Sequence, residues 1–165
     1  MKQNDKFTTK FKNDLMKKLL DNKKIVEYIN KDYLESPEEL MYENIFPYIK
    51  LKQATEEDEE VYIGIAVSTP SVAEISDVFR DVDITFFILS HIGRLKTSDG
   101  GAVTDLIGDE ILATFNHLKD LSFEFKLYSN DEGAYNEKYY FRQIIFTCTI
   151  QNNTMNGIKI NRYGR

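Results

Sequence analysis

Four segments with alternating apolar and polar residues constrain the fold of this chain most strongly. They span residues 61–68, 76–91, 121–129 and 139–151. Alternation with a period of two is typical of β-strands that turn one face toward a core. Between the second and third segments, apolar residues recur with helical spacing across 103–118. The order strand–strand–helix–strand–strand predicts an α+β fold, with a four-stranded, mostly antiparallel sheet and a helix between two hairpins.

The connections between these elements are expected to be exposed loops. Residues 69–76 are predicted to form a hairpin loop, and 130–138 a turn-rich loop in which Gly133 can take a positive φ. Residues 91–102 form a long polar connection to the central helix. Because loops on a rigid scaffold often carry contacts, 91–102 and 129–138 are candidate docking loops, although plain mobility explains them equally.

The N-terminal region predicts helices. Phe7, Phe11, Leu15 and Leu19 recur every four residues, and lysines occupy the other faces. This pattern is typical of an amphipathic helix. Residues 25–29 are expected to continue as a second short helix or turn.

A further helix is predicted in "SPEELMYENIFPYI". Ser36 is a favourable N-cap, Pro37 suits the first helical position, and Glu39 completes a capping box. Pro47 disfavours helical backbone at the residue before it, so this helix should end by Phe46 at the latest.

Length and cysteine content limit the possible architectures. The 165 residues suit one domain over 1–151, followed by a polar tail over 152–165. The single cysteine, Cys148, excludes an intrachain disulfide and a thiolate metal cluster, and its apolar neighbours predict burial. We expect neither a secretory signal at the N-terminus nor a membrane span, because no apolar stretch of about 18 residues occurs.

Charge is unevenly distributed along the chain, whose formal net charge is −6. Residues 2–24 contain eight Lys and three Asp, whereas residues 27–60 contain eleven acids and three Lys. The run Glu56–Glu60 is interpreted as a solvated acidic linker. The acidic balance argues against binding to duplex nucleic acid. The asymmetry favours a subunit that meets its neighbours through complementary faces, or simply solvated surfaces.

Gly100 and Gly101 precede the central helix, where a phosphate-binding loop would lie. The Lys-Ser/Thr pair of a P-loop does not follow them, and the dinucleotide pattern G-x-G-x-x-G is missing. We therefore expect a flexible loop in which Ser98 or Asp99 caps the helix, with an anion site at the helix N-terminus as the alternative.

Candidate catalytic groups do not form a known arrangement. The two histidines, His91 and His117, lack a metal-binding spacing, and acids such as Asp105 and Asp109 are interpreted as a solvated helix face. No Ser-His-Asp or Cys-His signature occurs. We predict that the protein is not an enzyme and uses no cofactor and no metal.

The layout as a whole is similar to that of bacteriophage tail terminators. The likeness rests on "FTTKFKNDLMKKLL", "ENIFPYIKL", "VYIGIAVS", "TDLIGDEILATF" and the final hairpin "LSFEFKLYSNDEGAYNEKYYFRQIIFTCTI". In that family a strand leads through a loop to a central helix of the kind RxDLIxDEI, and a hairpin follows.

The resemblance covers about residues 5–151 and implies a structural virion protein of the tail or neck, made in the host cytoplasm. Its subunits would form a hexameric ring on the last ring of the tail tube and would face the head-side connector or stopper. The acidic run and the polar tail depart from the pattern, as added contacts to a sheath or connector or as insertions. Candidate interface residues are Lys17, Lys18, Glu57, Glu59, Arg94, Lys96, Asp99, Glu132, Tyr135 and Arg162.

Three other interpretations stay open. A head-completion or connector-stopper protein of the neck would bind portal-side complexes rather than tail tubes. A small cytoplasmic enzyme or regulator with a ferredoxin-like sheet would need catalytic pairings that the sequence does not display. A nucleic-acid-binding module would use the Lys-rich N-terminal helix and would bind DNA with a steep salt dependence.

Overall fold

The computed structural model describes residues 4–29, 34–53, 55, 58–68, 79–98, 100–118 and 124–151. The elements in chain order are α1 (Asn4–Asp21), α2 (Lys23–Ile29), the 3₁₀ helix η1 (Pro37–Leu40), β1 (Ile45–Phe46), β2 (Val61–Ser68), β3 (Phe79–His91), α3 (Ile92–Leu95), α4 (Val103–Phe115), β4 (Lys126–Ala134) and β5 (Tyr139–Gln151). None of the helices in these ranges is both long and apolar enough to cross a membrane.

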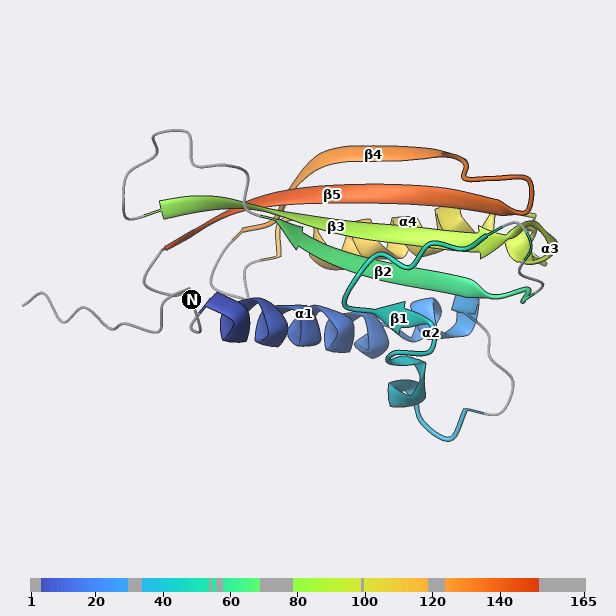
Figure 1. Ribbon diagram of the computed structural model, residues 1–165, viewed down its shortest axis with the longest axis horizontal. Helices are drawn as coiled ribbons and strands as arrows, with labels where there is room; N and C mark the ends of the chain where they lie inside the picture. The colour runs from blue at the N-terminus through green and yellow to red at the C-terminus, as the bar shows by residue number, and fades with distance from the viewer. Residues whose placement is uncertain are drawn as a thin grey trace, which may run out of the picture.

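One sheet organises the molecule, with the strand order β1-β2-β3-β5-β4 (Figure 1). The short β1 runs parallel to β2, and the other neighbouring pairs are antiparallel. The predicted α+β class, the two hairpin pairs and the helix between them are confirmed. The predicted number of four strands is wrong, because Ile45 and Phe46 add a fifth strand.

The first face of the sheet, here called the helix face, carries the main core. Alternate residues of β2, β3 and β5 meet apolar residues of α1, α2 and α4, as their periodicity predicted. Phe86 is central to it, with its ring centroid 4.7 Å from Phe115 and 6.0 Å from Phe146. Cys148 is buried here as predicted, and burial raises the pKa of its thiol to about 12.

The second face of the sheet holds a smaller aromatic cluster formed by Phe46, Tyr62, Phe87, Leu89 and Tyr139. Residues 47–53, which we call the strap, cross this face after β1, while α4 lies behind the sheet (Figure 1). We call this side the strap face.

Close approach of the strap to the sheet requires a glycine on β2. A Cβ at position 64 would lie 2.7 Å from the Tyr48 carbonyl oxygen and 2.9 Å from the Ile49 Cα. Gly64 therefore allows backbone to pack directly on backbone.

The helix predicted to follow the N-cap Ser36 and to end by Phe46 at the latest is a short 3₁₀ helix, Pro37–Leu40. The Glu39 carboxylate does accept a hydrogen bond from the Ser36 backbone N–H, as a capping box requires. Helical structure nevertheless ends at Leu40, and Tyr42 has a φ of 66°. Tertiary contacts then take over, since the Asn44 side chain donates to the Val61 carbonyl and Ile45 pairs with β2.

Two of the predicted loops also contain regular structure. The strand predicted over 121–129 begins at Lys126 in the described chain and continues to Ala134, so most of the predicted turn is strand. Residues 91–102 include α3, and a turn with Gly100 at φ 85° brings Lys96 into a backbone bridge with Ala102. Ser98 does not cap α4, whose N-cap is Ala102. The predicted loop 69–76 and Asp99 lie outside the described residues.

Candidate functional site

The predicted interface residues fall in three separate places. Lys17 and Lys18 lie on α1, a second group surrounds α3, and a third lies on β4 and the turn after it. Glu57, Asp99 and Arg162 are outside the described part of the chain.

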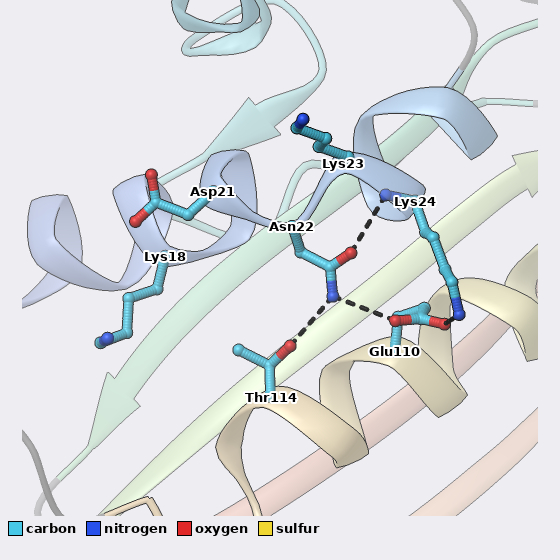
Figure 2. A pocket seen from close by; sticks show the side chains of 7 residues that line it. All are labelled: Lys18, Asp21, Asn22, Lys23, Lys24, Glu110 and Thr114. Carbon is cyan, nitrogen blue, oxygen red and sulfur yellow. Dashed lines mark hydrogen bonds and ion pairs between the residues drawn. The ribbon is translucent and has the colours of Figure 1, made fainter.

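The first place is an open hollow of about 480 Å³ where α1, α2 and α4 meet (Figure 2). Asn22, between α1 and α2, donates to Glu110 and to Thr114 of α4, both at 3.1 Å. Its own Oδ1 accepts from the backbone N–H of Lys24, whose ammonium lies 2.8 Å from Glu110. Hydrogen bonds from Lys24 and Asn22 lower the pKa of Glu110. The polar side chains between these three helices therefore bind one another. Lys18 also lines the hollow.

The second place is α3, where the predicted residues make contacts within the chain. Arg94 donates to the Ile29 carbonyl at the end of α2, a position where a cation is favourable. A Cβ on Gly93 would lie 2.9 Å from Glu59 Cδ, so that exposed side chain rests against α3. Lys96 is exposed. Arg94 thus holds two helices together in this structure.

The third place is β4 and the turn into β5. Glu132 is exposed on β4, whereas Tyr135 is half-buried with its ring edge-on to Phe87, 6.4 Å between centroids. Tyr135 is therefore attached to the aromatic cluster of the strap face.

One group of hydrogen-bonded titratable side chains on the strap face was not predicted. Lys52, Asp58, Tyr62 and Tyr139 form it, and we call it the Asp58 cluster. Lys52 is 7% exposed and donates to Asp58 Oδ2 at 2.5 Å. The Tyr62 hydroxyl donates to the same oxygen at 2.5 Å, and the Tyr139 hydroxyl donates to Oδ1 at 3.0 Å.

The charge states of the Asp58 cluster are fixed by these contacts. Burial acts to raise the pKa of Asp58, but hydrogen bonds from Lys52, Tyr62 and Tyr139 outweigh it and hold the pKa at about 2. Burial and the bond to Asp58 raise the pKa of Tyr62. A general acid or base needs a pKa near the working pH. The cluster therefore fits a structural role: it fastens the end of the strap to β2 and β5.

Other contacts fasten the rest of the strap. Lys12 of α1 donates to the Pro47 carbonyl at 2.7 Å, and Asn136 donates to the Lys52 carbonyl at 3.1 Å. The Lys50 ammonium lies 4.4 Å from the centroid of the Phe46 ring. The acidic run was predicted to be solvated throughout, and Asp58 corrects that interpretation.

A family model matches residues 13–148, which reach from α1 to β5. The chain belongs to the YomW family. The match spans most of the sequence and includes the strap and the Asp58 cluster, but it names no activity or partner. No curated protein matches the YomW-family chain. The resemblance to tail terminators stays a prediction, since neither comparison tests it.

Local sequence carried little signal for the Asp58 cluster in this YomW-family protein. Asp58 stands within a run of five acids, and its partner Tyr139 is 81 residues away. Only the apolar flanks of Tyr62 and Tyr139 marked them as strand residues. Their pairing depends on how β2, β3 and β5 are ordered in the sheet.

Proposed function

We propose that this protein is a structural subunit of a phage tail, which caps the tail tube as a ring and joins it to the head-side connector. The observation that carries the proposal is a pair of differently charged exposed surfaces. Lys10, Lys17 and Lys23 are exposed on α1 and α2, whereas Glu38 of η1 and Glu43, between η1 and β1, are exposed nearby in the sequence. A closed ring needs two different surfaces that match one another.

The layout supports the same proposal. An N-terminal amphipathic helix, an antiparallel sheet and a central helix before the last hairpin follow the order of the tail-terminator resemblance. As part of the same proposal, we assign the chain a tail-terminator-like fold and a ring of six subunits.

The direct test is mass measurement combined with electron microscopy. The purified chain, mixed with tail tubes from the parent virion, is expected to form a ring at one end of each tube. Lys17→Glu with Lys18→Glu should weaken ring formation, while Glu27→Gln on α2 serves as a control. A chain that stays monomeric with tubes present would contradict the proposal. Binding to portal-side complexes instead of tubes would identify a stopper.

A further inference from the structure

The outer edge of β4 is an unusual surface in this fold. β4 pairs with β5 along one side, and no other described strand lies along its other side. Each of its nine residues is exposed or half-exposed, and the Tyr128 side chain is 73% exposed. The backbone N–H and C=O groups along such an edge form a template for another strand.

A β-bulge gives this edge a specific pattern. Leu127 and Ser129 pair with consecutive residues of β5, so Tyr128 is an extra residue in β4. Directly paired residues point to the same face of a sheet. Because the bulge shifts the alternation by one, Lys126 and Asp131 share the strap face.

The same shift acts on the other face. Leu127 and Asn130 pair with Phe146 and Ile144 of β5, so both lie on the helix face. Residues at equal distances before and after the midpoint between Tyr128 and Ser129 therefore lie on the same face of the sheet. This is the symmetry that a two-fold strand pairing requires.

We propose that two copies of the chain pair through antiparallel β4 strands, with the two-fold axis between Tyr128 and Ser129. In this register Lys126 of each copy lies opposite Asp131 of the other, and Leu127 lies opposite Asn130. The two sheets become one continuous sheet across the pair. A parallel pairing of the same two edges would turn the second sheet over, so that Lys126 of the two copies would lie on opposite faces and the two charge pairs would not form. Charges and a bulge at an edge discourage indiscriminate pairing, and here they leave one favourable register.

This contact is distinct from the proposed ring. A two-fold contact uses the same surface on both copies and closes with two, whereas a ring joins two different surfaces. The inference therefore does not depend on the proposed function, and the two can fail separately.

Sedimentation velocity over a wide concentration range tests the inference. The wild-type chain is expected to show a concentration-dependent dimer. Lys126→Asp places like charges opposite each other twice and should raise the dissociation constant about tenfold. The double variant Lys126→Asp with Asp131→Lys exchanges the two charges and should restore the wild-type value to within about threefold. Lys17→Asp makes the same charge change on α1 and serves as the control.

The outcomes separate the two proposals. A monomer at every concentration, or a dimer that Lys126→Asp does not weaken, overturns β4 pairing. A double variant that remains as weak as the single one overturns it as well. A dimer that obeys the charge exchange but never caps tubes supports β4 pairing alone.

Discussion

The two faces of the sheet are covered in different ways. On the helix face, α1, α2 and α4 bury an apolar core whose spacing can be recognised in the sequence. On the strap face, a stretch without regular structure covers five aromatic and aliphatic residues, held by the Asp58 cluster and by the close approach at Gly64. The helix face is therefore covered by elements whose apolar periodicity matches it. The strap face is covered by a segment that individual polar contacts and one glycine hold in place. We therefore expect the strap face to open more easily than the helix face.

Neighbouring phenylalanines on β3 give the largest expected effect and the sharpest contrast. Phe86 is fully buried on the helix face, and Phe87 is 8% exposed on the strap face. Phe86→Ala should lower the free energy of unfolding by about 3–5 kcal/mol, since the packed helices limit collapse of the cavity. Phe87→Ala should cost at least about 1 kcal/mol less, because the strap can settle into the space. Urea denaturation measures both, and equal losses would break the comparison.

The approach of the strap to β2 can be tested at Gly64. Gly64→Val would drive a branched side chain into the backbone of Tyr48 and Ile49 and should cost about 1–3 kcal/mol. Ala66→Val is the matched control, because it lies on the same strand and the same face, two residues further along. Thermal unfolding followed by circular dichroism compares them. If both variants were equally stable, direct backbone packing at Gly64 would not hold the strap.

A smaller effect is expected from the Asp58 cluster. Tyr139→Phe removes a hydroxyl that donates to the Asp58 carboxylate and also to its backbone carbonyl, at 3.1 Å. We expect a loss of about 1 kcal/mol in urea denaturation, below the about 1.5–3 kcal/mol typical of a hydrogen bond to a charged group, because water reaches the 39%-exposed Asp58 side chain. Tyr140→Phe, the next residue on the opposite face, should change stability less. A larger loss of stability for Tyr140→Phe than for Tyr139→Phe would contradict a stabilising role of Tyr139 in the Asp58 cluster.

The Asp58 cluster also makes stability depend on pH. The pKa of Asp58 is about 2 in the folded protein and close to 3.8 when unfolded, so its ionised form stabilises the fold. This stabilisation is fully present above pH about 4 and disappears as the pH falls toward 2. The stability difference between the wild type and Asp58→Asn should shrink over that interval in urea titrations. A difference that stays constant from pH 5 to pH 2 would contradict the assigned pKa.

Much of the helix face was predictable from the sequence because its signals are local. Phe11, Leu15 and Leu19 repeat with helical spacing, and the residues of β2 alternate over eight positions. The final strand was predicted with its observed bounds, Tyr139–Gln151. In each segment the local preference agrees with the face that the fold buries.

The rest was not predictable because tertiary contacts override local preference. Glu39 signals a helix, but strand pairing at Ile45 ends it early. Pairing with β5 continues β4 to Ala134, through a segment rich in turn residues. At the candidate site, Arg94 donates to the end of α2, a contact between residues 65 positions apart that local sequence did not reveal. Lys52 and Asp58 had no local mark of burial.

Limited trypsin digestion under native conditions tests most directly whether the strap opens independently of the helix face. Lys50 and Lys52 place two cleavage sites within the strap, and Lys17 on α1 provides an exposed reference. In the wild type, cleavage after Lys50 and Lys52 should be slow. Asp58→Asn should accelerate these two cuts, read by mass spectrometry, and leave the cut after Lys17 unchanged. Equal rates in both proteins, or acceleration at all sites together, would contradict independent opening of the strap.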